Sequence, residues 1–330
     1  MPIAVYGTGR ATPALRLPTS KIETDRHLAP GSLAQATGVL SRHVCNTEDQ
    51  ISLAVTACQL ALEDADTTPD QIDLVVFGAA VPYQPIPATA PLVMRALGMA
   101  DGSAAAFDVN ATCLSFIAAF DLAARQIATG AARRALVVSS EIASRALPWE
   151  DDIETAALFG DGAAAMVLGA APTGSAACLA AMQLRSYPSA YDACTLGAGG
   201  TRFDFHNDPA GFAAHARFAM DGKALFRLTA QHFKGFVADL LAKADWRQGD
   251  VALVVPHQAS PAGLAHMIRQ TGFAPAQVVD IAADYGNQIA ASIPFAYDLA
   301  RREGRIGAGD KVLLLGTSAG VSFGGLALVA

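Results

Sequence analysis

The second half of this 330-residue chain repeats the order of apolar strands and helices found in its first half. In the first half, buried strands are predicted around Val75 and Val137, which are 62 residues apart, with helices before and between them. In the second half, the corresponding strands are predicted around Leu253 and Leu313, which are 60 residues apart. We interpret the repeat as two copies of one α/β unit, related by a pseudo-two-fold axis.

The two expected halves cover residues 1–170 and 171–330, and their elements follow from apolar periodicity. Helices are predicted over 50–64, 113–129, 224–244, 261–271 and 289–304. Strands are predicted over 3–7, 72–78, 134–139, 159–169, 250–256, 278–280 and 311–315. The segment that follows the first strand, through Arg42, is predicted to be polar and irregular. The uncharged run 162–182 contains a proline and glycines, so it is interpreted as two strands and a turn rather than a membrane span.

Composition narrows the functional classes. Hydrophobic residues make up 52% of the chain and charged residues 16%, which is enough apolar material for a large core. The net charge of −7 comes without a block of basic residues, so binding to nucleic acid or to an anionic membrane is not expected. The five cysteines form no C-x-x-C pair, and their odd number argues against a disulfide framework. The N-terminus does not have the pattern of a signal peptide, so a reducing, cytoplasmic location is expected.

The stretch Phe107–Phe116 contains the first candidate catalytic residue, Cys113. From Cys113 to Thr129 the residues predict a helix that is apolar around most of its circumference, and such a helix has to be buried. Cys113 is then expected at the N-terminus of this helix, where unpaired backbone N–H groups and the helix dipole favour a thiolate. Taken alone, a cysteine in an apolar run is more often a small core residue.

Two polar residues of the second copy are expected to converge with Cys113. Asn287 precedes the helix that corresponds to the one after Cys113, and His257 closes the strand around Leu253. Acyl transfer through a thioester needs a thiolate, a group that stabilises negative charge, and backbone N–H donors. A neutral imidazole and a side-chain amide can both donate hydrogen bonds to a developing enolate, and the glycine-containing turn 316–320 lets backbone approach a ligand closely. Taken alone, His257 would be a capping or surface residue and Asn287 a turn residue.

At these residues the chain resembles the thiolase superfamily and, within it, the β-ketoacyl-ACP synthase III branch. The resemblance covers the whole chain and rests on motifs that are weak singly but specific in their order and spacing. These motifs are Phe107-Asp108-Val109 up to Cys113, Phe159-Gly160-Asp161-Gly162-Ala163, Met220-x-Gly222 with Phe226, Pro256-His257-Gln258-Ala259, and Gly286-Asn287 followed by 290–294. The resemblance implies a layered αβαβα core made of two pseudo-symmetric halves, and an acyltransferase.

The resemblance also implies roles for the site residues. Cys113 would accept an acyl group from a starter thioester, and His257 and Asn287 would stabilise the carbanion formed when a malonyl unit loses carbon dioxide. The backbone N–H groups of Cys113 and Ala319 would form the oxyanion hole. Substrate-binding residues are expected at Ile86, Phe159, Gly222, Phe226, Gln258 and Ser260. No metal and no other cofactor is implied, because the substrates are acyl and malonyl thioesters.

The resemblance implies a homodimer in which the loop around Ile86 reaches into the partner's acyl pocket. An aromatic residue is common at this position, so Ile86 indicates a different or wider acyl channel. The expected partners are acyl carrier protein and coenzyme A thioesters. The housekeeping enzymes of fatty-acid initiation in this branch bind coenzyme A with a tryptophan and arginines. The corresponding positions in this chain are Ser32, Ala36, Ile153 and Ala262. Because these contacts are lost, the donor is expected to be a carrier-protein thioester, or coenzyme A held differently.

The function expected from the sequence is decarboxylative Claisen condensation of an acyl group on Cys113 with a malonyl thioester, in fatty-acid or secondary-metabolite synthesis. Two alternatives stay open. One is transfer of the acyl group from Cys113 to a hydroxyl or amine without decarboxylation. The other is a non-catalytic partner subunit of another synthase. The segment 186–219 is interpreted either as a lid over the tunnel mouth or as a surface insertion.

Overall fold

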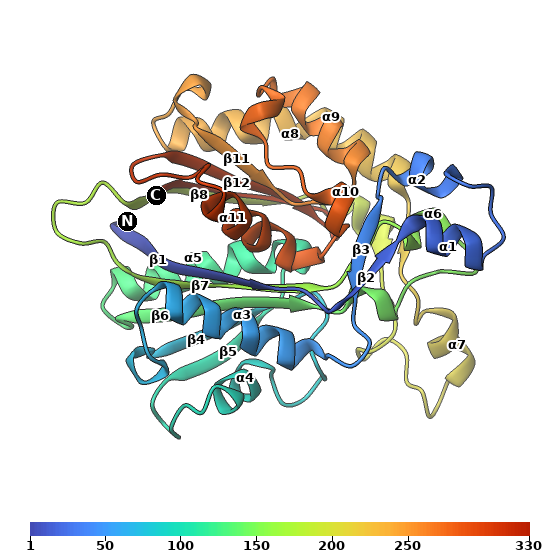
Figure 1. The fold of residues 1–330 in the computed structure, drawn as a ribbon, viewed down its shortest axis with the longest axis horizontal. Coiled ribbons are helices and arrows are strands. Elements are labelled where there is room, and N and C mark those ends of the chain that lie inside the picture. The colour runs from blue at the N-terminus through green and yellow to red at the C-terminus, as the bar shows by residue number, and fades with distance from the viewer.

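The computed structural model describes all 330 residues. The core of the fold consists of alternating layers of helices and sheets in the order αβαβα (Figure 1). Helices lie between the two large sheets, and further helices cover the outer face of each sheet. This arrangement confirms the α/β class and the layered αβαβα core expected from the sequence. Both termini lie at one end of the molecule, on the left in Figure 1.

The first sheet has five strands in the order β1-β7-β6-β4-β5. Its strands are β1 (Ile3–Ala11), β4 (Leu74–Gly78), β5 (Ala105–Val109), β6 (Arg134–Glu141) and β7 (Gly162–Ala170). β4 is parallel to its neighbours β5 and β6, whereas β7 is antiparallel to β6 and β1. β5 therefore lies at an edge of the sheet, with one side unpaired.

The second sheet has four strands in the order β11-β12-β13-β8. Its strands are β8 (Cys178–Ser186), β11 (Leu253–Pro256), β12 (Lys311–Ser318) and β13 (Ser322–Val329). β11 and β12 are parallel, and the other pairs are antiparallel. Each sheet thus has parallel strands beside antiparallel ones, and this shared arrangement corresponds to the repeat in the sequence.

The two helices between the sheets are α5 (Ser115–Ala128) and α11 (Ser292–Arg302). Leu114, Phe116 and Phe120 at and within α5 belong to one buried cluster with residues of both sheets, such as Val76 and Leu314. The burial predicted for the helix after Cys113 is therefore confirmed. The outer helices are α3 (Gln50–Asp64) and α4 (Ala90–Ala96) on the first sheet, and α8 (Gly222–Lys243) and α9 (Pro261–Thr271) on the second.

The segment through Arg42 is regular, contrary to the prediction. It forms β2 (Leu15–Pro18), α1 (Thr19–Asp25), α2 (Ser32–Thr37) and β3 (Ser41–Val44), and β2 pairs with β3. These elements are too short for periodicity to reveal, and α2 depends on a tertiary contact. The buried Glu23 carboxylate accepts the backbone N–H groups of Gly31, Leu33 and Ala34 at the start of that helix, at 2.7 to 3.0 Å.

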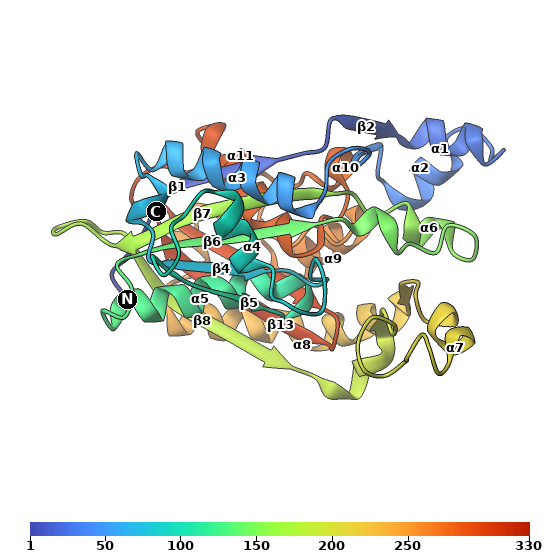
Figure 2. The same ribbon diagram turned by 90° about the horizontal axis from the view of Figure 1, so that it is seen from below.

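The predicted strand 278–280 is only a single bridge between Val254 and Val278. The segment 186–219 contains β9 (Cys194–Thr195) and α7 (Pro209–Ala214), and β9 pairs with β10 (Ala219–Met220). Together with α1, α2 and α6 (Ile153–Ala156), α7 lies at the end of the molecule away from the termini (Figure 2). The residues of α7 are not buried, which favours the surface-insertion interpretation for that part of the segment.

Candidate active site

Two turns of the same construction lead into the central helices. In the first, Asn110 Oδ1 accepts the N–H of Thr112 at 2.9 Å, and Thr112 has a φ of +50°. In the second, Asn287 Oδ1 accepts the N–H of Ile289 at 2.8 Å, and Ile289 also has a φ of +50°. Because a positive φ is costly for a β-branched residue, both turns depend on the hydrogen bonds that hold them. Asn287 is therefore the structural counterpart of Asn110.

Ser115 and Ser292 complete the two turns in the same way. In each, Oγ accepts the N–H four residues earlier, at 2.9 Å and 3.1 Å. Cys113 then corresponds to Ala290, three residues after Asn287. The two catalytic candidates precede equivalent helices, as predicted, but they occupy different positions of the turn. The 3₁₀ turn 112–114 contacts the 3₁₀ turn 289–291 and β12, so the two helix starts approach each other.

Cys113 lies in the 3₁₀ turn, two residues before α5, rather than at the first residue of the helix. Burial of the thiol, together with the nearby Cys194 and Glu141, raises the pKa of Cys113 to about 12. The backbone N–H groups of Ala319 and of Cys113 itself lower the pKa of the thiol. The prediction of a resting thiolate is therefore wrong, because desolvation outweighs the N–H donors at this helix start.

His257 follows β11 and is only 6% exposed. Burial lowers the pKa of His257 to about 4, so the imidazole is neutral at physiological pH. Its Nδ1 has no hydrogen-bond partner, and its backbone N–H donates to Leu315 O at 2.7 Å. Gly316 on β12 separates His257 from Leu114, since a Cβ on Gly316 would lie 3.1 Å from His257 Cβ and 2.8 Å from Leu114 Cδ2. His257 therefore lies beside the residue that follows Cys113.

Asn287 is held by backbone pairing as well as by its side chain. Its N–H donates to Leu158 O at 2.8 Å, and its carbonyl accepts the N–H of Gly160 at 3.1 Å. This makes a parallel bridge between Phe159 and Asn287. The Asn287 amide Nδ2 donates to Ala259 O at 3.4 Å, two residues beyond His257. The first half of the chain thus positions a residue of the second half.

Sequence reasoning missed two ionisable groups beside Cys113. Glu141 ends β6 and is fully buried, and burial raises the pKa of its carboxyl to about 8. Cys194 lies in β9, and burial raises the pKa of its thiol to about 12. An acidic residue directly after a buried strand is a signal that could have found Glu141. Nothing in the pattern around Cys194 points to its contact with the site, because β9 reaches it only through the tertiary fold.

The other predicted substrate-binding residues divide into two groups. Phe159 is buried and meets Phe218 edge-on at 5.2 Å between ring centroids. Gln258 is fully buried, and its amide donates to Pro256 O and Val279 O and accepts the N–H of Ile281. The prediction that Gln258 binds substrate is therefore corrected, since both its polar atoms fasten the segment after β11.

Ser260, Gly222, Phe226 and Ile86 are nearer to solvent. Ser260 Oγ caps α9 by accepting the N–H of Gly263 at 3.0 Å, and Gly222 begins α8. Phe226 is half exposed and packs on His266, with 4.1 Å between ring centroids. Ile86 is 87% exposed.

The four positions where coenzyme A contacts were missing lie around one end of the molecule. Ser32 and Ala36 are exposed on α2, Ile153 begins α6, and Ala262 is exposed at the start of α9. α2 contacts α6, and a Cβ on Gly38 would lie 2.8 Å from Pro261 Cβ, so the three helices adjoin. None of the four side chains can supply a charge or a planar ring to a nucleotide.

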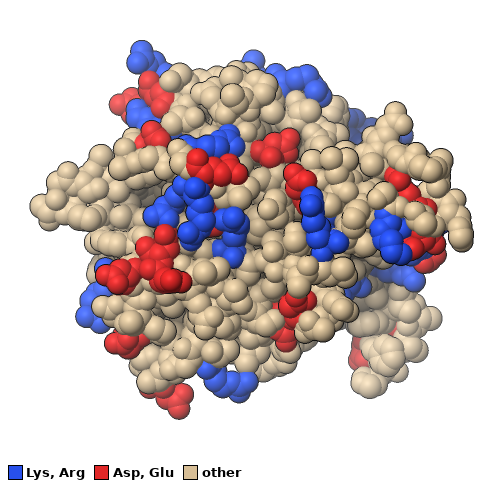
Figure 3. Space-filling view, viewed as in Figure 1, with Lys and Arg blue, Asp and Glu red and all other residues tan.

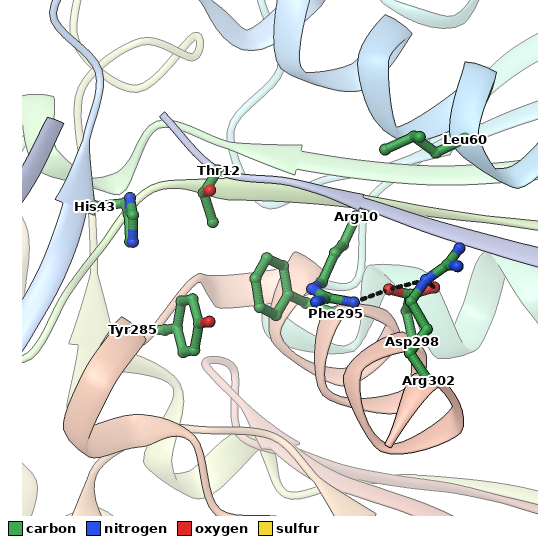
Figure 4. Close-up of a pocket in the computed structure, with 8 residues that line it drawn as sticks. All are labelled: Arg10, Thr12, His43, Leu60, Tyr285, Phe295, Asp298 and Arg302. Carbon is green, nitrogen blue, oxygen red and sulfur yellow. Dashed lines mark hydrogen bonds and ion pairs between the residues drawn. The ribbon is translucent and has the colours of Figure 1, made fainter. Parts of the chain in front are cut away.

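A separate cleft of about 420 Å³ lies between β1, α3 and α11 (Figure 4). Arg10 and Arg302 both pair with the fully buried Asp298 there, and His43 stacks on Tyr285. Figure 3 shows basic side chains gathered on this face of the molecule, with acidic side chains beside them. The cleft contains none of the predicted catalytic residues.

No group of three or more His, Cys, Asp or Glu side chains comes together as metal ligands would. All five cysteines are free. None of the helices combines the length and apolar composition that crossing a membrane requires.

Two family models match the chain. The model for 3-oxoacyl-[acyl-carrier-protein] synthase III matches residues 107–188, and the model for the C-terminal part of that enzyme matches residues 241–330. β-Ketoacyl-[acyl-carrier-protein] synthase III 3 of Streptomyces coelicolor is 36% identical over 323 residues, which cover 98% of this chain and 95% of the relative. The β-ketoacyl-[acyl-carrier-protein] synthase III of Symbiobacterium thermophilum is 33% identical over 328 residues, 99% of this chain and 98% of the relative.

Solved structures have the same fold. The 3-oxoacyl-(acyl carrier protein) synthase III of Pseudomonas aeruginosa PAO1 superposes with a TM-score of 0.89 at 31% identity, over 100% of this chain and 98% of that chain. Cerulenin-bound OleA of Xanthomonas campestris superposes with a TM-score of 0.86 at 24% identity, over 100% of this chain and 97% of that chain, and shows the fold alone.

Proposed function

Because the chain belongs to the 3-oxoacyl-[acyl-carrier-protein] synthase III family, we propose that it condenses an acyl group held on Cys113 with a malonyl thioester. The observation that carries the proposal is that a neutral, buried imidazole, His257, lies beside Leu114, the residue that follows the half-buried Cys113. Cys113 carries a proton that has to leave, and His257 is uncharged and able to accept it. Asn287 adds a neutral amide on the adjacent turn.

In the first step, Cys113 takes the acyl group from its donor. The imidazole of His257 accepts the thiol proton as the sulfur attacks the acyl carbonyl carbon. The bond from Cys113 Sγ to the acyl carbon forms, and the bond from that carbon to the donor sulfur breaks. The leaving donor thiolate takes the proton from His257, so the imidazole is neutral again before the second substrate binds.

In the second step, the malonyl thioester loses carbon dioxide. The electron pair of the broken carbon–carbon bond forms an enolate, whose oxygen accepts hydrogen bonds from His257 and Asn287. The enolate carbon attacks the acyl carbonyl on Cys113, and the oxyanion accepts the N–H groups of Cys113 and Ala319. Collapse of this intermediate releases the β-ketoacyl product and the Cys113 thiolate, which takes up a proton. This chemistry needs no metal and no cofactor.

The proposed acyl donor is a carrier-protein thioester. Ser32, Ala36, Ile153 and Ala262 offer no cationic or planar group for the nucleotide of coenzyme A, so the donor has to be held by other contacts. A carrier protein can bind through a protein surface instead. We propose a cytoplasmic location, where the free cysteines would stay reduced.

We also infer that the chain forms a homodimer. β5 is an edge strand whose Phe107 and Val109 are incompletely buried, and an unpaired apolar edge invites pairing with a second copy. Ile86 is a large apolar side chain that a partner subunit would cover. Sedimentation equilibrium at micromolar concentration is expected to give twice the chain mass, and a monomer there would contradict the inference.

The test of the proposed function is intact-protein mass after incubation with panels of acyl-CoAs and acyl carrier proteins, followed by malonyl thioester. A mass gain that is absent in Cys113→Ala, and carbon dioxide release that depends on both substrates, are the expected results. Acylation without carbon dioxide release would support transfer to a hydroxyl or amine acceptor. This is the second candidate function because the expected coenzyme A contacts are missing and Ile86 replaces the common aromatic residue. A stable complex with another synthase and no acyl-enzyme would support the partner-subunit alternative.

A further inference from the structure

Glu141 is a buried carboxyl for which the proposed mechanism has no use. It ends β6, where it pairs with Gly162 of β7, and it is 1% exposed. Burial raises the pKa of this carboxyl to about 8, so it is largely protonated at neutral pH. The nearby Asp161 raises the pKa of Glu141, and Cys194 raises the pKa of Cys113. Glu141 forms no salt bridge with a cation. A carboxyl kept in such a place at the cost of desolvation calls for a structural or functional reason.

The Glu141 carboxyl lies against two chain segments that are far apart in sequence. Oε1 accepts the N–H of Ala80 at 2.6 Å, and the nearby N–H of Val81 lowers the pKa of the carboxyl. These residues begin the loop that carries the exposed Ile86. The N–H of Ala290, in the 3₁₀ turn that follows Asn287, also acts on the carboxyl and lowers its pKa. β6 is in contact with that turn.

The Ala290 contact matters because of the internal repeat. Ala290 occupies the position that Cys113 has in the first turn, and its N–H is a donor that the short 3₁₀ turn leaves free at a helix start. The same turn fixes the Asn287 side chain, since Asn287 Oδ1 accepts the N–H of Ile289, directly before Ala290. A carboxyl at the end of β6, against this turn, is placed to restrain the peptide units that aim the Asn287 amide.

We propose that Glu141 is a positioning residue for the condensation step, because it fixes the turn that orients Asn287 through the Ala290 N–H. Through Ala80 it also joins that turn to the loop that carries Ile86. The proposal rests on the proposed function of the site. Because it acts on Asn287, it concerns decarboxylation and not the acylation of Cys113. A displacement of about 1 Å at a catalytic group can lower a rate by about 100-fold.

The test compares Glu141→Leu, which keeps the volume and removes every acceptor, with Glu141→Gln, which keeps one acceptor oxygen. Glu63→Gln on the exposed face of α3 is the matched control. In Glu141→Leu, kcat for malonyl decarboxylation is expected to fall about 100-fold while KM and the rate of Cys113 acylation stay within about threefold. Glu141→Gln is expected to keep kcat within about tenfold of the wild type, and the control to match the wild type.

A double-mutant cycle with Asn287→Ala separates positioning from general stability. If Glu141 acts through Asn287, Glu141→Leu has no further effect on decarboxylation in the Asn287→Ala background. Additive losses, or equal losses in acylation and decarboxylation, would overturn the proposal. If Glu141→Leu does not fold, the same cycle with Glu141→Gln decides. A wild type that never releases carbon dioxide would overturn the proposed function and this inference with it, whereas an active wild type with additive losses overturns only the inference.

Discussion

Gly286 sets the backbone geometry from which Asn287 reaches the site. Its φ of +67° and ψ of −166° lie in a region that essentially only glycine occupies. A Cβ on Gly286 would lie 2.8 Å from Leu158 O, 3.1 Å from Phe159 C and 3.2 Å from Gly160 N. All three are backbone atoms of the segment that pairs with Asn287, so no side chain can rotate away to relieve the contact.

Gly286→Ala is therefore expected to lower the free energy of unfolding by about 3 kcal/mol, from backbone strain of about 1–3 kcal/mol and the displacement of the paired segment. The same displacement moves the Asn287 amide, so malonyl decarboxylation is expected to fall about 100-fold while acylation of Cys113 continues. Urea unfolding, intact-protein mass and carbon dioxide release measure the three quantities.

Gly235→Ala is the matched control. Gly235 lies inside α8, has an ordinary φ, and a Cβ there meets no atom within 4 Å. Alanine is favoured over glycine in a helix by about 1 kcal/mol, so this variant is expected to be more stable than the wild type with unchanged activity. The reasoning would be refuted if Gly286→Ala were as stable as the wild type, or if it slowed acylation and decarboxylation equally.

Three further predictions follow from the charges of the site and of the cleft. Cys113→Ala is expected to abolish the acyl mass gain, and Cys194→Ala to keep it, as intact-protein mass measures. Because the pKa of His257 is lowered to about 4 from 6.5, the unfolded chain binds a proton there that the folded chain does not, so stability falls as pH drops from about 6.5 to 4, by about 3 kcal/mol. His257→Gln removes this part of the pH dependence of unfolding. Asp298→Ala leaves two guanidinium groups without their buried partner, and urea unfolding is expected to show a loss of about 3–5 kcal/mol.

Long apolar elements were predictable because periodicity alone specifies them. The bounds predicted for α3 and α9 agree with the structure, and the predicted burial of α5 is confirmed. β13 was missed because its sequence, Ser322–Val329, contains a pair of glycines that weaken any strand pattern. A Cβ on Gly324 would lie 2.9 Å from Leu114 Cδ1, so the glycine that hides the strand is the one that lets the helix after Cys113 approach it.

The residues of the candidate site are predictable from the sequence, but its electrostatic environment is not. Cys113, His257 and Asn287 are candidates because the repeat and the motifs locate strand ends and turns. The protonation state of Cys113 could not be predicted, because it depends first on burial of the thiol and then on the nearby Cys194 and Glu141, and all three arise only after the chain has folded. A helix start favours a thiolate by a local rule, and burial overrides the rule through contacts that no local pattern records.

The two turns show how a symmetric fold becomes an asymmetric catalyst. Both have the same hydrogen bonds and the same positive φ, so their backbone geometry belongs to the repeat and not to the chemistry. The differences lie in single side chains. The first turn places Cys113 where the second has Ala290, and Asn110 donates to Ala80 O in an exposed position, whereas Asn287 donates to Ala259 O in a buried one. In the proposed mechanism, the first turn holds the acyl group and the second faces the enolate. The carboxyl of Glu141 accepts the N–H of Ala80 and ends the strand that contacts the second turn, so in our proposal it joins the two copies.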